Sequence, residues 1–288
     1  MSSKHRLVIL LGPTAVGKTE RSLELARLYD SPVISCDSRQ IYREMYIGTA
    51  APGPEILEQV QHYFIRDHSV KDLYTAGKYE LEALEVIRRL FAEGHDTLVM
   101  TGGSGFYIDA VCNGLDDFPP TDPALREEIS ARLREEGVKS LAEELKSLDR
   151  ESYETIDISN GQRVVRALEV CLMTGRPFSS FKTNPRKKRE FDIEKIGLTR
   201  PREELYERID RRAEQMLRGG LEEEVRSLLP LRDLPALQTV GYQELFPVFD
   251  GEYSVDSALE LIQRNTRRYA KRQMSWFRRD KSIVWEEL

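Results

Sequence analysis

The chain has 288 residues, of which 40% are hydrophobic and 32% are charged, and this balance excludes a disordered chain and a membrane-spanning one. Its three cysteines are far apart, which argues against a zinc site or a disulfide framework and is typical of a reducing cytosol. The net charge of −6 argues by itself against a nucleic-acid partner, but basic residues cluster at 182–189 and 264–281, so a local basic face is compatible with it. We expect a cytoplasmic protein with no membrane partner, because no signal-peptide pattern is visible.

The first hundred residues alternate between strand and helix patterns. Residues 6–11 are a short apolar run that predicts a buried strand, and helical spacing follows at 18–29. Further strands are predicted at 32–36, 62–65 and 97–100, with a helix at 79–91 between the last two. This alternation predicts an α/β fold with a mostly parallel sheet.

The pattern changes after residue 117. Residues 121–181 show helix patterns and no convincing strand, beginning with Asp122 as a helix cap and Pro123 in the first turn. A strand at 191–198 then returns the chain to the sheet, and helices are predicted at 202–217, 220–229, 239–249 and 255–279. We therefore expect an α/β core formed by residues 1–117 and 187–288, with a small all-helical domain inserted at 118–186.

A complete P-loop pattern, G-x-x-x-x-G-K-[ST], stands between the first strand and the first helix. The backbone N–H groups of such a loop and the helix N-terminus hold an anion, while the lysine neutralises phosphate charge and the final hydroxyl binds Mg²⁺. The pattern predicts a polyphosphate site but not which polyphosphate binds. The predicted phosphate-binding residues are Gly12, Pro13, Thr14, Ala15, Val16, Gly17, Lys18 and Thr19.

An acidic residue follows the predicted strand at 32–36, and none follows the predicted strand at 97–100. The strand at 97–100 runs into Thr101-Gly-Gly-Ser-Gly105, without the Asp of a usual P-loop hydrolase. Asp37 ends the strand at 32–36, which faces the crevice beside the P-loop in such a sheet. It can hold Mg²⁺, accept a proton from a substrate, or merely cap a turn.

Several sequence blocks are spread over nearly the whole length of the chain. In chain order they are the P-loop, Asp37-Ser-Arg-Gln-Ile-Tyr42, Met45-Tyr-Ile-Gly-Thr-Ala50, Thr101-Gly-Gly-Ser-Gly-Phe-Tyr107, Gln162-Arg-Val-Val-Arg-Ala-Leu-Glu169, Arg208-Ile-Asp-Arg-Arg212, Gly220-Leu-Glu-Glu-Glu-Val225, Val240-Gly-Tyr242 and Lys271-Arg-Gln273. Together these blocks resemble the tRNA dimethylallyltransferase (isopentenyltransferase) family in its bacterial form. Ser104 departs from the threonine usual in the family, and Thr101 replaces an apolar residue.

The resemblance implies a P-loop NTPase-like core and a transfer reaction. A dimethylallyl group would move from dimethylallyl diphosphate to the N6 amine of the adenosine 3′ of the anticodon, releasing diphosphate, with Mg²⁺ as cofactor at Thr19. The resemblance implies that Asp37, Lys18, Thr19 and Arg212 are catalytic, and Ser104, which we rank ahead of Thr101, is expected to contact the diphosphate.

The same resemblance implies a tRNA anticodon stem-loop as partner. The target base must leave its stack to reach a pocket. We expect the helical insertion to contact the tRNA. We also expect the enzyme to be a monomer. Spacing also predicts one basic helix face formed by Arg264, Arg267, Arg268, Lys271 and Arg272. The residues implied in tRNA binding are Asp37, Ser38, Arg39, Gln40, Gly103, Gln162, Arg163, Val164, Val165, Arg166, Lys271 and Arg272.

Three other functions share parts of this pattern. A P-loop kinase of a small metabolite has the same phosphate loop, an isopentenyltransferase of free adenine nucleotides needs no tRNA surface, and a nucleotide-binding scaffold needs no chemistry. The Asp37 block counts against the scaffold, and a kinase does not account for the helix at 162–166 or the basic C-terminal helix.

Overall fold

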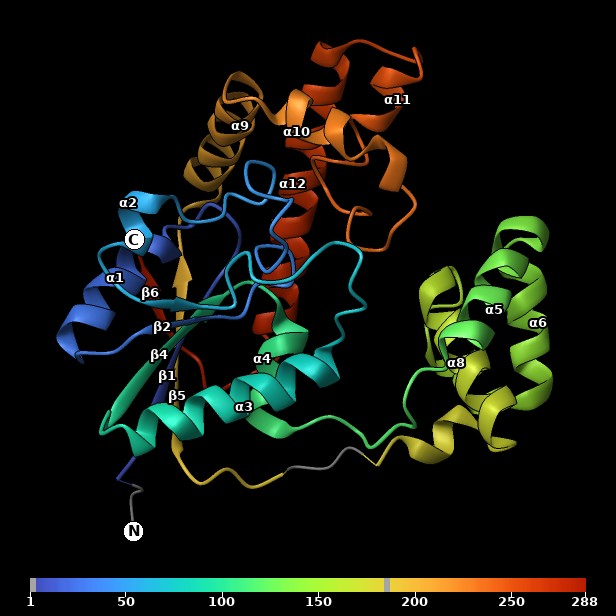
Figure 1. Ribbon diagram of the computed structural model, residues 1–288, viewed down its shortest axis with the longest axis horizontal. Coiled ribbons are helices and arrows are strands. Elements are labelled where there is room, and N and C mark those ends of the chain that lie inside the picture. The colour runs from blue at the N-terminus through green and yellow to red at the C-terminus, as the bar shows by residue number, and fades with distance from the viewer. Residues whose placement is uncertain (1–3, 184–186) are drawn as a thin grey trace. The chain divides into compact units, whose positions relative to one another are not determined.

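The computed structural model describes residues 4–183 and 187–288 (Figure 1). The chain divides into two compact units, one formed by Met1–Asn113 with Lys188–Leu288 and the other by Gly114–Lys187. The first division lies a few residues before the predicted one, since Asp116 accepts hydrogen bonds from Thr183 and Asp117 pairs with Lys187. These contacts join the two ends of the second unit.

The first unit is built on a single parallel sheet with the strand order β3-β2-β4-β1-β5-β6 in the described part of the chain. The α/β prediction is therefore confirmed. The edge strand β6 was not predicted, because it is short, charged and largely exposed. The strands are β1 (Arg6–Leu11), β2 (Val33–Ser35), β3 (His62–Tyr63), β4 (Thr97–Gly102), β5 (Asp192–Thr199) and β6 (Val284–Glu287).

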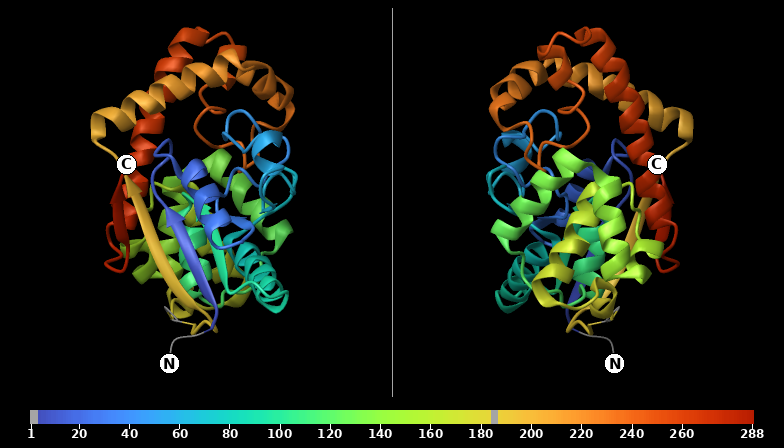
Figure 2. Two further views of the ribbon diagram at one scale, coloured as in Figure 1. Left: turned by 90° about the vertical axis from the view of Figure 1, so that its left-hand side faces the viewer. Right: turned by 90° about the vertical axis from the view of Figure 1, so that its right-hand side faces the viewer.

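Helices cover both faces of this sheet. Alternate residues of β1 point to opposite cores: Leu7 and Ile9 join the cluster that includes α3, and Val8 joins the cluster that includes α1 and α9. Figure 1 shows the β5 arrow pointing toward α9, and Figure 2 shows β1 and β5 side by side. The helices are α1 (Lys18–Leu28), α2 (Pro54–Leu57), α3 (Ala76–Ala92), α4 (Gly105–Asn113), α9 (Arg202–Arg218), α10 (Leu221–Ser227), α11 (Phe246–Phe249) and α12 (Val255–Phe277), with a 3₁₀ turn at Leu229–Leu231.

One predicted helix of this unit is mostly wrong. Residues 239–249 contain only the short α11 at their end, and turns precede it. Gly241 has a φ of +100°, a conformation that interrupts a helix and that glycine adopts without strain.

The second unit is all-helical. Its core contains Ile129, Leu141, Leu145 and Leu168. The predicted cap is confirmed, because the Asp122 carboxylate accepts hydrogen bonds from the N–H groups of Ala124 and Leu125. The helices are α5 (Pro123–Glu136), α6 (Val138–Leu148), α7 (Arg150–Thr155) and α8 (Gly161–Thr174), followed by a 3₁₀ turn at Phe178–Phe181.

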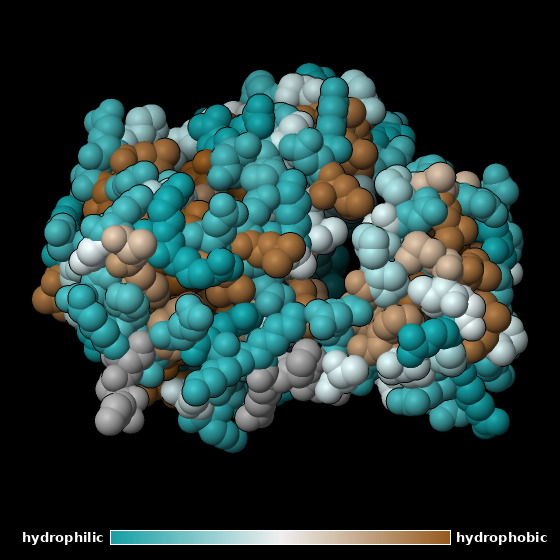
Figure 3. All heavy atoms as spheres, turned by 60° about the horizontal axis from the view of Figure 1, so that its bottom comes forward, coloured by the Kyte–Doolittle hydropathy of each residue, from teal (hydrophilic) through white to brown (hydrophobic). Residues whose placement is uncertain are grey.

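Hydrophilic side chains cover most of the face shown in Figure 3, with apolar groups in smaller patches. Across residues 4–183 and 187–288, no helix is both long enough and apolar enough to cross a lipid bilayer.

Candidate active site

The P-loop has the predicted context, leaving β1 at Leu11 and entering α1 at Lys18. Gly17 caps α1 with a φ of +116°, which a residue with a side chain rarely adopts. A Cβ on Gly12 would lie 2.8 Å from the carbonyl oxygen of Leu198, so only glycine fits against β5. The two glycines thus shape a loop in which backbone N–H groups can face an anion.

Lys18 lies beneath this loop. Its Nζ donates hydrogen bonds to the carbonyls of Gly12, at 3.0 Å, and Pro13, at 2.9 Å. Burial lowers the pKa of Lys18 to about 8, and the positive charge of Arg212 also lowers it, while Asp37 opposes the shift. Burial therefore disfavours the charged form of Lys18, and an anionic ligand bound beside it would reduce that unfavourable free energy.

Three arginines donate hydrogen bonds to the loop. Arg212 of α9 donates to the Thr14 hydroxyl, Arg208 donates to the Ala15 carbonyl at 2.8 Å, and Arg200 donates to the Val16 carbonyl at 2.7 Å. Burial lowers the pKa of Arg212 to about 10. Arg212 was predicted at the site and Arg208 was not, although a spacing of four residues puts both on one helix face.

Asp37 follows β2 at the same edge of the sheet. Its Oδ1 accepts hydrogen bonds from the N–H groups of Arg39, at 2.8 Å, and Gln40, at 3.2 Å. Asp37 also lines the two cavities described below. The carboxylate is therefore a turn cap and a cavity group together, so these alternatives do not exclude each other.

The structure favours Thr101 over Ser104 as a candidate contact for the diphosphate, which reverses the predicted order. The Ser104 hydroxyl accepts the Ser38 N–H at 2.9 Å and donates to the Ser38 hydroxyl at 3.0 Å, so it is occupied within the protein. Thr101 lines the larger cavity, and its buried hydroxyl has no hydrogen-bond partner among the described residues. The structure gives no support to Ser104 as a direct diphosphate contact and shows it holding Ser38.

Gln273 of α12 links the P-loop to the loop after β4. Its Oε1 accepts the Thr14 N–H and its Nε2 donates to the Gly103 carbonyl, both at 2.9 Å. A Cβ on Gly103 would lie 2.2 Å from that Nε2, so the bridge requires glycine there. Gly103, predicted to contact tRNA, thus has a structural role in the site. Gln273 was not predicted as a site residue.

Two adjacent cavities share this site. The larger, of about 360 Å³, is lined by the P-loop from Thr14 to Thr19, with Arg208 and Arg212. The smaller, of about 100 Å³, shares five residues with the larger one and adds an apolar wall. The shared residues are Thr14, Asp37, Thr49, Arg212 and Tyr269, and the apolar wall consists of Ile209, Ala213, Met216, Val240 and Ile262.

This arrangement suits a particular class of ligand. Cations and backbone N–H groups favour a polyphosphate in the larger cavity, the smaller one can bury a short apolar group, and Asp37 stands where they meet. The described residues contain no group of three or more His, Cys, Asp or Glu side chains that could hold a metal. Mg²⁺ needs no such group when phosphate and water complete its shell, so the Thr19 hydroxyl fits the predicted magnesium site.

A model of the IPP transferase family matches residues 40–280. The tRNA dimethylallyltransferase 2 of Porphyromonas gingivalis is 53% identical over 281 residues, which cover 98% of this chain and 93% of that protein. This chain belongs to the IPP transferase family. The tRNA dimethylallyltransferase 1 of Bacteroides thetaiotaomicron is 49% identical over 279 residues, covering 97% of this chain and 90% of that protein.

Solved structures agree with this family assignment. The tRNA isopentenylpyrophosphate transferase of Bacillus halodurans is 34% identical, with a TM-score of 0.71, and the match covers 98% of this chain and 90% of that one. A eukaryotic dimethylallyltransferase acting on tRNA has a TM-score of 0.78 over 98% of this chain and 74% of its own. Its identity of 22% supports a likeness of fold alone.

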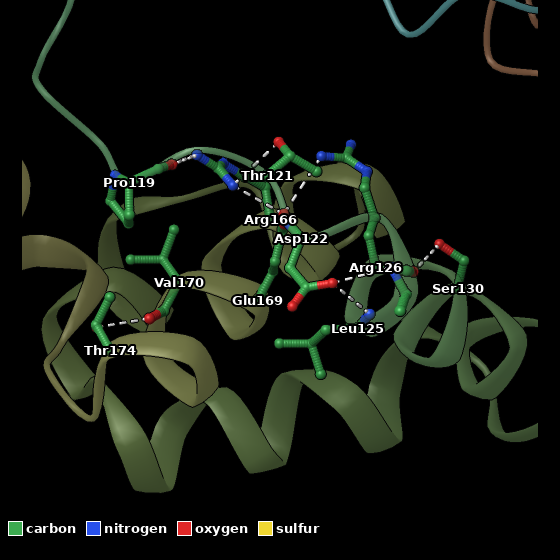
Figure 4. Close-up of polar contacts among 11 residues, drawn as sticks. Pro119, Thr121, Asp122, Leu125, Arg126, Ser130, Arg166, Glu169, Val170 and Thr174 are labelled. Carbon is green, nitrogen blue, oxygen red and sulfur yellow. Dashed lines mark hydrogen bonds and ion pairs between the residues drawn. The ribbon is translucent and has the colours of Figure 1, made fainter.

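The α8 block of this IPP transferase family member is largely structural. Gln162 and Arg163 are exposed, but the side chains of Val164 and Val165 lie fully buried in the helical core and cannot reach an RNA. Arg166 donates to the buried Glu169 carboxylate at 2.9 Å and to the Pro119 carbonyl at 2.8 Å (Figure 4). The prediction of direct tRNA contact is therefore wrong for the two valine side chains, and Arg166 is engaged in holding its own unit together.

The predicted basic face of α12 loses one member. Arg267 pairs with Asp210 of α9, so its charge is already compensated. Part of the second basic segment, residues 184–186, lies outside the described residues, and within the remainder Arg189 pairs with Glu80. We call the exposed cations the α12 basic face, which consists of Arg264, Arg268, Lys271 and Arg272.

Proposed function

We propose that this chain transfers the dimethylallyl group of dimethylallyl diphosphate to the N6 amine of the adenosine 3′ of the anticodon in tRNA. The observation that carries the proposal is the position of Asp37, where a cationic cavity meets a smaller apolar one. The relatives named as tRNA dimethylallyltransferases support the same reaction over a kinase or a nucleotide-binding scaffold.

The reaction breaks the allylic C–O bond and forms a C–N bond. The electron pair of the broken bond goes to diphosphate, whose added charge Lys18 and Arg212 would stabilise together with the P-loop N–H groups. The apolar wall of the smaller cavity would bury the five-carbon group. Mg²⁺, held through Thr19 and the phosphates, would supply further charge neutralisation.

Asp37 would act on the acceptor. Its carboxylate would orient the adenine amine and take the proton that N6 loses as the C–N bond forms. The two hydrogen bonds to Oδ1 fix the side chain in place, which keeps the acceptor close to the allylic carbon. Two neighbouring residues predicted to bind tRNA also lie at these cavities: Arg39 lines the smaller cavity and Gln40 lines the larger one.

The tRNA would be held by exposed polar residues of each unit. Gln162 and Arg163 are available on α8, and Lys271 and Arg272 belong to the α12 basic face. Backbone phosphates would meet these cations, while the target base is extruded to reach Asp37. The proposal includes a monomer acting in the cytoplasm, where tRNA is present.

A single assay tests the function against its alternatives. The protein is incubated with Mg²⁺ and labelled dimethylallyl diphosphate, together with unmodified tRNA or with AMP, and separately with ATP. We expect label in tRNA, at the adenosine 3′ of the anticodon. Label in AMP without label in tRNA would favour the free-nucleotide transferase, and phosphoryl transfer from ATP would favour the kinase.

A further inference from the structure

Residues from three of the sequence blocks meet at one carboxylate. Glu224 of α10 accepts hydrogen bonds at Oε2 from the N–H groups of Tyr46, at 3.0 Å, and Ile47, at 2.7 Å. Its Oε1 accepts the Gly48 N–H at 3.0 Å and the Tyr242 hydroxyl at 2.6 Å. Three consecutive N–H groups directed at one anion form an anion-binding backbone turn, here filled by the protein's own side chain.

Tyr242 closes the other side of this contact. It is fully buried, and burial followed by the Glu224 charge raises its pKa, so the phenol stays protonated and donates to Glu224. A Cβ on Gly48 would lie 2.5 Å from Cε2 of the Tyr242 ring, so the chain can pass here only as glycine. The backbone at 46–48 is therefore held between a carboxylate and an aromatic ring.

The same segment leads directly into the cavity walls. Gly48 and Thr49 line the smaller cavity, and Thr49 with Ala50 lines the larger one. The Gln40 side chain donates to the carbonyls of Thr49 and Ala50, both at 3.1 Å. The Gln40 N–H in turn donates to the Asp37 carboxylate at 3.2 Å, so hydrogen bonds join the anchored loop to the proposed base.

We propose that Glu224 is a positioning residue that sets the loop at 46–50 and, through Gln40, the place of Asp37 between the two cavities. The inference rests on the proposed function, because it gives Asp37 the role of acceptor base. Glu224 lines neither of the two cavities. The P-loop does not depend on it, since Lys18, Arg208 and Arg212 hold that loop by separate contacts.

The test compares Glu224→Gln with Glu223→Gln, an exposed neighbour on the same helix. The amide of Glu224→Gln retains the size of the side chain but turns an NH₂ group toward N–H donors, so it cannot accept all four hydrogen bonds. We expect kcat for tRNA prenylation to fall about ten- to a hundredfold, as small displacements of catalytic groups do. The Kd for inorganic diphosphate with Mg²⁺ should stay within about threefold of wild type, and Glu223→Gln should change neither value.

A structural readout separates this inference from the proposed function. Hydrogen–deuterium exchange should be faster in Glu224→Gln over the peptide containing residues 45–50, and Gly48→Ala should show the same selective loss of kcat. Unchanged exchange would remove the anchor, and faster exchange with wild-type kcat would remove its link to catalysis. An equal loss of diphosphate binding would overturn the proposal, because the P-loop would then depend on Glu224 as well. A wild-type protein that does not prenylate tRNA would instead refute the proposed function.

Discussion

Lys18→Met should stabilise the ligand-free protein while it abolishes tight diphosphate binding. Burial lowers the pKa of Lys18 from 10.5 to about 8, so at pH 7 the folded protein keeps a charge that the unfolded chain holds more cheaply in water. A shift of that size corresponds to roughly 3 kcal/mol of lost stability. Methionine has a similar length and no charge, so the substitution removes this cost.

Part of the gain is offset. The Lys18 ammonium donates to the carbonyls of Gly12 and Pro13, and losing each hydrogen bond costs about 1 kcal/mol. The expected net stabilisation is therefore about 1–2 kcal/mol, or a Tm higher by about 2–6 °C for a protein of this size.

The pH dependence identifies the cause. Below pH 8, the folded-state pKa, Lys18 is charged in both states and the cost is fully present. As pH rises from 8 to 10.5, Lys18 loses its proton in the folded protein but keeps it in the unfolded chain, so the unfolding free energy of wild type rises relative to that of the variant. Above pH 10.5 Lys18 is neutral in both states, and the electrostatic difference between wild type and variant is gone. The measurement is the difference in unfolding free energy between wild type and Lys18→Met from pH 7 to 11, which cancels groups common to both.

Ligand should reverse the order of stabilities. Diphosphate at about a hundred times its Kd would stabilise wild type by about 2.7 kcal/mol and the variant far less. The control is Lys195→Met: burial opposes its charge, yet the hydrogen bond to Asp280 at 2.6 Å helps to raise the pKa of Lys195, so this substitution should destabilise. A Lys18→Met protein less stable than wild type at pH 7 without ligand, or stabilised equally by diphosphate, would refute the reasoning.

Three further predictions test other parts of the site. Asp37→Asn keeps an oxygen for the two N–H groups that Asp37 caps, but the amide cannot take a proton. We expect kcat to fall about 10²–10⁴-fold, while the diphosphate affinity measured by calorimetry stays unchanged. A fall in kcat of less than about tenfold would exclude Asp37 as the base. Replacing the residues of the α12 basic face with glutamates should weaken tRNA binding in a filter assay and flatten the salt dependence of that affinity. Unchanged binding would remove α12 from the RNA site. Arg166→Ala removes one of two arginines from the buried Glu169 carboxylate, which keeps its contact with Arg126, so it should cost about 2 kcal/mol in stability. The accompanying loss of tRNA affinity should not depend on anticodon-loop sequence, and a sequence-dependent loss would restore base reading by Arg166.

The fold was predictable wherever one local pattern decided the outcome. The apolar run of β1 and the Asp122 cap depend on neighbouring residues, so the sequence specifies them directly. The segment at 239–245 has apolar spacing but is set by a distant contact, since Tyr242 donates to Glu224 and Gly241 turns the chain. Strand β6 pairs with β5 although its own residues are charged or exposed, so nothing local predicts it.

The same distinction divides the site. Lys18, Thr19 and Asp37 lie within short motifs, whereas Gln273 reaches Thr14 across 259 positions, a pairing that spacing cannot indicate. Val164 and Val165 came from a family block, and helical periodicity could have placed both inward with Leu168. A family block marks positions that matter to the fold or to the reaction, and burial is needed to separate the two.

Asp37 shows why separating structure from chemistry residue by residue can mislead. Its Oδ1 caps the turn at 39–40, and the Ser104 hydroxyl holds the adjacent Ser38. A carboxylate that is free to rotate would spend part of its time away from the acceptor amine, so the cap reduces the entropy that the reaction must otherwise lose. In the proposed function the cap would therefore belong to the chemistry: the bonds that identify Asp37 as a structural residue would also prepare it to act as a base.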